Sequence, residues 1–205
     1  MLKRNGINKH LKRQRLYESV VKVINKHSSD FIILSVRYYK WYYIIAHIIS
    51  FGALLKGRRK FAHTCCIYKY GVDPRIIEAI GSGVNHKGLY DAYFNGKFNG
   101  RVVAHIIKGN ITKRQRFQQS SYIEHELLGK KYRVLKAIRA WIDLKKEHKD
   151  SEDNVFCTDL TLDLGERILN KQIVGNNAEI TPSELMEILD VEGYTSFVIF
   201  DSKNV

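Results

Sequence analysis

The segment Phe61–Val84, FAHTCCIYKYGVDPRIIEAIGSGV, predicts the element around which the rest of the chain is organised. Its first part, Phe61–Tyr68, is a run of apolar, β-branched and aromatic residues, which is typical of a strand. Turn-forming residues follow at Tyr70–Pro74, and Arg75–Ile80 is a second apolar run. Two such runs joined by a turn predict an antiparallel β-hairpin, which ends at the Gly-Ser-Gly of residues 81–83.

Two polar residues, His63 and Glu78, lie inside these otherwise apolar strands. A buried carboxylate needs a partner, and a histidine across a hairpin is a natural one. A symmetric hairpin centred on Val72 places Glu78 opposite Cys66, on the face away from His63. We therefore expect a one-residue change of register, from a bulge or an asymmetric loop, if the two side chains are to meet.

A third reactive residue, Cys157, lies far downstream in the sequence FCTDL, where an apolar helical pattern begins. At a helix N-terminus the unpaired N–H groups and the helix dipole lower the pKa of a thiol. The same N–H groups can hold the oxyanion of a tetrahedral intermediate. Cys157, His63 and Glu78 thus combine a thiol nucleophile, its base and the group that orients the base. The alternative interpretation of Cys157 is a small buried hydrophobic residue, and that of His63 a hydrogen-bonded core histidine.

The order of these segments resembles the permuted NlpC/P60 (YiiX-like) branch of the papain-fold cysteine hydrolases, in which the histidine precedes the cysteine. The resemblance rests on His63, the following IIEAIGSGV and the later FCTDL. Three further segments are similar to motifs of that family. Asp30–Leu34 is similar to its opening GDIIL strand, with Ser29 in place of the glycine. Gly129–Tyr132 is similar to its GxxY element, with Arg133 in place of the usual aspartate, and Thr181–Leu185 is similar to its TPxDL segment. The resemblance covers the chain from about Asp30 to its end.

This resemblance implies an α+β, papain-like fold over residues 29–205, with a central antiparallel sheet packed on helices, behind a basic N-terminal arm of residues 1–28. It implies a thiol hydrolase that cleaves an amide bond through an acyl-enzyme on Cys157, with cell-wall peptides as one substrate class and with no cofactor or metal. Related branches act on lipid esters or transfer acyl groups, so a lipid-directed esterase or acyltransferase is an alternative. Tyr132, in the GxxY element, and Asp159, beside the nucleophile, are candidates for bordering the substrate site.

Charge is distributed unevenly along the chain, which has a net charge of +13. Residues 1–149 hold 31 Lys and Arg against 9 Asp and Glu, so +22, whereas residues 150–205 hold 3 against 12, so −9. Residues 1–28 alone carry eight Lys or Arg against one acid, with apolar residues at helical spacing, which predicts a basic arm leading into a short amphipathic helix. We expect an anionic polymer or membrane surface as its partner. A nucleic-acid- or anionic-surface-binding protein on an inactive hydrolase fold is the rival function.

The three cysteines, Cys65, Cys66 and Cys157, are too few for a disulfide framework. Cys65 and Cys66 point to opposite faces of a strand, so at least one thiol is expected to stay free. Cys65 is the competing nucleophile, since it lies two residues from His63, but a mid-strand position offers no helix terminus to activate it. The spacing of His63, Cys65 and Cys66 matches none of the paired-ligand patterns of structural zinc sites.

The remaining sequence predicts one domain with further strands and helices. No secretory signal is expected, and the longest apolar stretch, Trp41–Leu55, is too short and too interrupted for a membrane span, so it predicts a buried or interfacial helix. Strands are expected at Asp30–Val36, Arg101–Lys108 and Tyr194–Phe200, helices at Thr112–Leu128, Val134–Ile142, from Cys157 and from Thr181, and an irregular connection at Asn85–Gly100.

Overall fold

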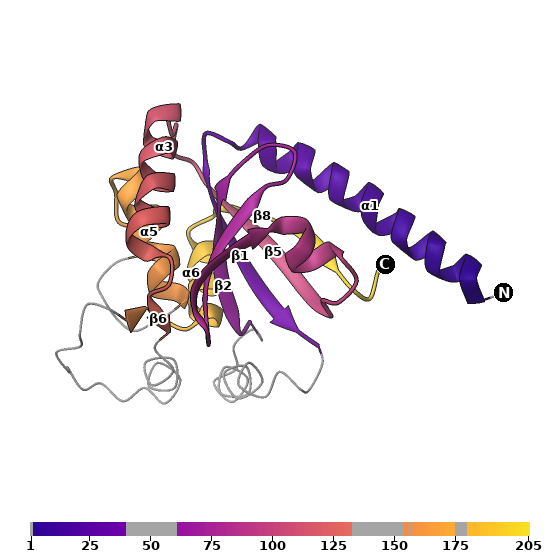
Figure 1. Cartoon of the computed structure of the whole chain (residues 1–205). Helices are drawn as coiled ribbons and strands as arrows, with labels where there is room; N and C mark the ends of the chain where they lie inside the picture. Colours follow the sequence, from indigo (N-terminus) through magenta and orange to yellow (C-terminus); the bar gives the residue numbers. More distant parts are fainter. Residues whose placement is uncertain (1, 40–60, 133–153, 156, 175–179) are drawn as a thin grey trace.

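The computed structural model describes the chain except for residues 1, 40–60, 133–153, 156 and 175–179 (Figure 1). Its centre is a six-stranded antiparallel sheet in the order β4-β3-β2-β1-β5-β8. The strands are β1 Phe31–Tyr38, β2 His63–Lys69, β3 Arg75–Ile80, β4 Gly83–Gly88, β5 Gly100–Ile107 and β8 Thr195–Asp201. Two short strands, β6 Lys131–Tyr132 and β7 Asn154–Val155, pair in parallel beside it. The predicted α+β class and the antiparallel sheet are confirmed.

Helical segments cover both faces of this sheet. They are α1 Leu2–Lys26, η1 Tyr90–Phe94, α3 Lys113–Tyr122, η2 Ile123–Leu127, α5 Cys157–Leu169 and α6 Pro182–Val191. One core lies between the sheet and α1 with η1, and the other lies between the sheet and η2, α5 and α6. The central strand β1 supplies Ile32 and Leu34 to the first core and Phe31 and Ile33 to the second. Burial on both faces explains why its sequence is continuously apolar instead of alternating.

Helix α1 is longer than the short helix expected from the sequence, since it runs for 25 residues. Its C-terminal half packs Tyr17, Val20 and Ile24 against the sheet, where all three are buried. Its N-terminal half extends beyond the edge of the sheet (Figure 1). The apolar stripe of this basic helix is therefore used in the core.

The hairpin of β2 and β3 forms as predicted, and its register settles the position of Glu78. Near the turn Lys69 pairs with Arg75, but further on Ile67 pairs with Ile76, so the register shifts by one residue between them. Beyond this bulge Cys65, and not Cys66, lies opposite Glu78. The expected one-residue register change is therefore present, and it brings Glu78 to the face of His63.

The segment after the hairpin differs from the expected irregular connection. Residues 83–88 form strand β4, which pairs with β3 from Ile80 opposite Gly83 to Arg75 opposite Gly88. Two residues, Gly81 and Ser82, join the strands, and Gly-Ser is a favourable two-residue hairpin loop. The helices expected at Trp41–Leu55 and from Val134 lie outside the described residues.

Helix α6 anchors the start of β2 beside the histidine. Thr181 and Glu184 form a capping box with Pro182 at the start of the helix, as the sequence predicts. The Ser183 hydroxyl donates to the Phe61 carbonyl at 2.8 Å and accepts from the Phe61 N–H at 3.1 Å. None of the helices described combines the length and apolar content that crossing a membrane requires.

Candidate active site

His63 and Glu78 form a buried pair across the hairpin. The Nε2 atom of His63 lies 3.0 Å from Oε2 of Glu78, and the two side chains are only 7% and 3% exposed. His63 stands two residues before Cys65, which lies opposite Glu78, so the pair is diagonal on one face of β2 and β3. The predicted contact between His63 and Glu78 is thus present.

Cys157 is the first residue of α5, which packs against β2 and β3. The thiol is acted on by the His63 ring and by Thr64, and both favour its thiolate form. Burial alone would raise the pKa of Cys157, but the hydrogen bond and charge of His63 outweigh it, and the pKa is lowered. Because Nε2 of His63 is engaged by Glu78, Nδ1 is the ring nitrogen left for the thiol.

The pKa shifts of His63 and Glu78 also favour the charged forms of these groups. Burial disfavours the imidazolium, yet hydrogen bonds to Cys157 and Glu78 raise the pKa of His63 to about 9. Burial also disfavours the Glu78 carboxylate, but the hydrogen bond and charge of His63, with the charge of Lys87, lower its pKa to about 2. An imidazolium between a thiolate and a carboxylate stabilises both anions, and both anions stabilise it, at neutral pH.

Lys87, on β4, is a member of this cluster that the sequence did not single out. Its Nζ lies 2.5 Å from Oε1 of Glu78, so the two carboxylate oxygens of Glu78 face different cations. A sequence signal existed, since a Gly-Ser hairpin loop at residues 81–82 would set Glu78 opposite Asn85 and diagonal to Lys87.

The other two thiols have different surroundings. The Sγ atom of Cys65 lies 3.3 Å from the Tyr93 hydroxyl, and burial, followed by the charge of Glu78, raises the pKa of Cys65 well above its usual value. Burial raises the pKa of Cys66 to about 12, and this residue belongs to the same core as Cys157, on the face of the sheet opposite Cys65. Neither thiol is activated at neutral pH.

The two candidates for the border of the site lie on elements next to Cys157. Tyr132 is in β6, and its backbone pairs with Val155, two residues before Cys157. Asp159 is half-buried in the first turn of α5, where a carboxylate suits the helix dipole. Both stay predictions as substrate-site residues. The described part of the chain holds no group of three or more His, Cys, Asp or Glu side chains that could bind a metal ion.

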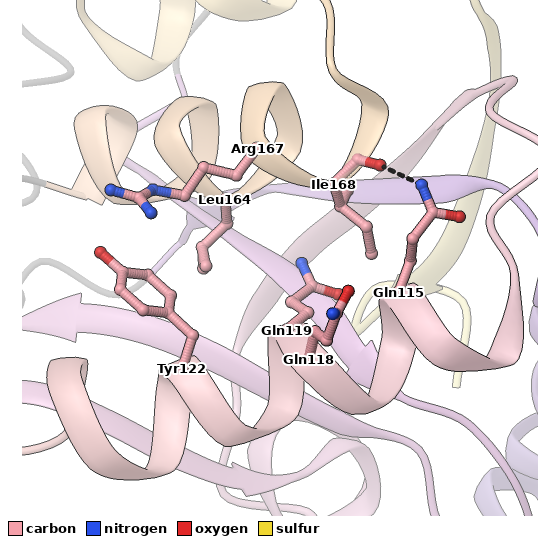
Figure 2. A pocket seen from close by; sticks show the side chains of 7 residues that line it. All are labelled: Gln115, Gln118, Gln119, Tyr122, Leu164, Arg167 and Ile168. Atoms are coloured by element: carbon pink, nitrogen blue, oxygen red, sulfur yellow. Dashed lines mark hydrogen bonds between the residues drawn. The ribbon is translucent and has the colours of Figure 1, made fainter.

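A cavity of about 220 Å³ lies between α3 and α5 and is lined from α5 by Leu164, Arg167 and Ile168 (Figure 2). Its ionisable side chains, Arg167 and Tyr122, are stacked, with the guanidinium carbon 4.4 Å from the ring centroid. The Nε2 of Gln119 has no hydrogen-bond partner but is itself inaccessible. This cavity offers no nucleophile or base, so the chemistry of the described residues is concentrated at Cys157 and His63.

No protein-family model and no curated protein matches the chain, so the assignment of a function depends on the geometry of this site.

Proposed function

We propose that the protein is a thiol hydrolase in which Cys157 is the nucleophile, His63 the base and Glu78 the group that orients the base. The observation that carries this proposal is the meeting of three groups from distant parts of the chain. The thiolate of a cysteine at a helix N-terminus is stabilised by a histidine whose Nε2 is 3.0 Å from a carboxylate. Buried polar groups are costly, and a row of them in this chemical order is what acyl transfer requires.

In the first half of the reaction, the Cys157 thiolate attacks the carbonyl carbon of the substrate and forms a carbon–sulfur bond. The N–H groups at the start of α5 face the developing oxyanion. His63 then gives its proton to the leaving nitrogen as the carbon–nitrogen bond breaks, which leaves an acyl-enzyme and a neutral imidazole. Glu78 keeps the ring oriented throughout.

In the second half, water attacks the acyl-enzyme carbonyl while His63 takes a proton from the water. The carbon–sulfur bond breaks, and the carboxylic acid product and the Cys157 thiolate are released. The imidazolium is restored, so each turnover consumes one water and no other co-reactant. An ester substrate follows the same steps with an alcohol as the leaving group.

A permuted papain-like fold of the NlpC/P60 kind agrees with this reading. The histidine strand β2 precedes the cysteine helix α5 in the chain, and α5 packs on the antiparallel sheet that carries His63 and Glu78. The fold assignment and the cell-wall peptide substrate both rest on the sequence resemblance. A lipid ester is the competing substrate.

The test is to incubate the protein with peptidoglycan fragments, with phospholipid vesicles and with an activated aryl ester, and to follow products by mass spectrometry. We expect a covalent acyl adduct on Cys157 from the aryl ester, and its absence in Cys157→Ala. Product from peptide identifies an amidase or peptidase, and product from phospholipid identifies the lipid-directed enzyme. If the aryl ester gives no adduct on Cys157 and no substrate is turned over, the proposal is wrong.

Polyanion binding is a second candidate function, favoured by the surface around α1 and α3. Exposed cations follow α1 and the first turn of α3: Lys9, Lys12, Arg15, Lys22, Lys26, Lys113 and Arg114. A groove of about 620 Å³ runs beside α3, lined in part by Lys69, Lys113 and Phe117, and Phe117 is 76% exposed. Tyr17, Val20 and Ile24 in the C-terminal half of α1 are buried against the sheet, and the exposed residues of this half named above are cations, so it offers charge to a partner. Nucleic acid suits such a surface, because cations bind phosphates and an exposed ring stacks on bases.

Fluorescence anisotropy with labelled single-stranded RNA, across a salt series, tests this second function. We expect the logarithm of the binding constant to fall linearly with the logarithm of salt concentration. Lys113→Glu combined with Arg114→Glu should reduce the slope by about 1–2. Lys171→Glu, which changes an exposed lysine outside this surface, is the matched control. Two results would argue against RNA binding by this surface: binding that does not depend on salt concentration, and equal weakening by the Lys113/Arg114 double variant and by Lys171→Glu.

A further inference from the structure

The Glu78 carboxylate is shared between two cations, which a carboxylate that merely orients a histidine does not need. Oε2 lies 3.0 Å from Nε2 of His63, and Oε1 lies 2.5 Å from Nζ of Lys87. The carboxylate itself is 3% exposed, whereas the lysine side chain is 41% exposed and reaches it from β4. A polar row therefore runs from the surface at Lys87 through Glu78 and His63 to Cys157.

The groups that face this row come from four elements. Each of these titratable groups either acts by its charge on His63 or Glu78 or is itself affected by the charge of Glu78. They are His63 and Cys65 on β2, Lys87 on β4, Tyr93 on η1 and Cys157 on α5. Burial raises the pKa values of Cys65 and Tyr93, and the charge of Glu78 raises both further, so both groups stay neutral through the physiological range. Lys87 is thus the cation that shares Glu78 with His63.

We propose that Lys87 is a positioning residue of this site that acts on His63 through Glu78: it offsets part of the negative charge of the carboxylate and so limits the pH range over which the imidazole keeps its proton. Its catalytic meaning rests on the proposed thiol hydrolase. The electrostatic role of Lys87 does not, since it concerns the titration of His63 whether or not Cys157 turns over a substrate.

The direction of the effect follows from the charges. The ammonium of Lys87 offsets part of the negative charge of Glu78, so it weakens the support that the carboxylate gives to the imidazolium. Without Lys87, His63 should keep its proton to a higher pH. Without the charge of Glu78, His63 should lose its proton at a lower pH. A general acid whose proton is held too firmly transfers it poorly, so Lys87 brings His63 closer to the pH at which it must work.

The chain offers a matched control for the lysine. Lys69 also lies 2.5 Å from a carboxylate, that of Glu124, and its side chain is likewise 41% exposed. The difference is in the acid, since Glu124 is 39% exposed and Glu78 is 3% exposed. Lys69→Met therefore removes an equivalent cation from a pair that does not touch His63.

The experiment is a pH titration by NMR of protein carrying isotope-labelled histidine rings, with the His63 signal assigned by its loss in His63→Gln. Lys87→Met should raise the His63 midpoint by about half a pH unit or more. Lys87→Gln, which also removes the charge but keeps a hydrogen-bond donor, should raise it too if the methionine variant folds poorly. Lys87→Arg should restore the wild-type midpoint, Lys69→Met should leave it unchanged, and Glu78→Gln should lower it.

The proposal is overturned if the midpoint is unmoved or lowered in Lys87→Met and Lys87→Gln, or if Lys69→Met moves it equally. A purely structural role for Lys87 would lower the melting temperature and leave the His63 midpoint where it was. The proposed hydrolase function is judged separately, by the acyl adduct on Cys157 in the wild-type protein, so the two ideas can fail independently.

Discussion

Cys157 and Cys65 lie near the same His63–Glu78 pair and are equally shielded, with 1% and 0% exposure, yet their pKa values shift in opposite directions. Cys65 faces the carboxylate directly and has a neutral phenol as its hydrogen-bond partner. Burial and the charge of Glu78 both raise its pKa. Cys157 instead faces the imidazole, which carries the positive charge that a thiolate needs, and its pKa is lowered despite burial.

This comparison teaches that burial does not decide which thiol is reactive. The order of charges does, because a carboxylate next to a thiol opposes ionisation, while the same carboxylate acting through a histidine promotes it. The backbone adds to the difference, since Cys157 begins a helix and Cys65 lies inside a strand whose N–H groups pair with neighbouring strands.

The largest expected effect is on turnover. Cys157→Ser should lower the rate with any substrate identified above by about 10⁴-fold or more, because the hydroxyl is a far weaker nucleophile in a site built for a thiolate. Cys65→Ser should keep most of the activity, since serine preserves a hydrogen bond to Tyr93. Steady-state kinetics on the two variants checks this. Activity retained by Cys157→Ser, or lost only in Cys65→Ser, would reverse the assignment of the nucleophile.

The second effect concerns labelling of the wild-type protein. At pH 6.5, iodoacetamide should alkylate Cys157 at least about 10²-fold faster than Cys65 or Cys66, because the thiolate is the reacting form, a cysteine with the ordinary pKa of about 8.5 is only about 1% ionised at this pH, and burial raises the pKa values of Cys65 and Cys66 further. Peptide mapping by mass spectrometry across a pH series measures the three rates in one sample. The proposed contrast between Cys157 and Cys65 is wrong if Cys65 is labelled first, or if all three thiols follow the pH profile of an ordinary cysteine.

The three residues that we propose as a triad could be picked out from the sequence, and so could the need for a register change between His63 and Glu78, but the position of that change could not. The hairpin follows from two apolar runs and a turn, and the start of α5 follows from an apolar helical pattern at Cys157. The bulge at Tyr68 leaves no such signal. Cys65, Cys66 and Ile67 are all apolar because both faces of β2 are buried, so polarity does not reveal which face each residue occupies.

Lys87 escaped prediction for a different reason. Strand β4 reads GVNHKG, which has one large apolar residue, Val84, because it lies at the edge of the sheet and its middle residues are partly exposed. Without an apolar pattern the segment resembles a loop. The two-residue loop at 81–82 was the available signal, and it fixes the register that points Lys87 at Glu78.

A third, smaller effect sharpens the role of the histidine. His63→Ala should slow the alkylation of Cys157 at pH 6.5 by about 10²-fold, because the thiolate loses its adjacent cation and keeps the cost of burial. The alkylation profile should move to higher pH. The control is His86→Ala, which removes a histidine that is hydrogen-bonded to Tyr68. Equal slowing in both histidine variants would indicate a general disturbance of the sheet.

The smallest effect is expected from Glu78→Gln, which acts on the ring and not on the sulfur. Alkylation of Cys157 near neutral pH should slow by about tenfold, because the imidazolium loses its anion and the neutral thiol–imidazole form gains population. The glutamine keeps a polar contact with His63, so the fold should survive. Glu124→Gln, at the exposed partner of Lys69, is the matched control and should change nothing.

The pH dependence of the ratio between the wild-type and Glu78→Gln alkylation rates tests most directly whether Glu78 acts through His63. The pKa of Glu78 is lowered to about 2, so its charge is present throughout the range in which the protein is assayed. The pKa of His63 is raised to about 9, so in the wild type the imidazolium supports the thiolate up to that pH and not beyond it. The ratio of wild-type to Glu78→Gln rates should therefore be largest between about pH 6 and 8 and should shrink as the pH rises through 9. A ratio that exceeds the effect of His63→Ala, or that stays constant with pH, would mean that Glu78 supports the fold or the sulfur directly and does not act through the histidine.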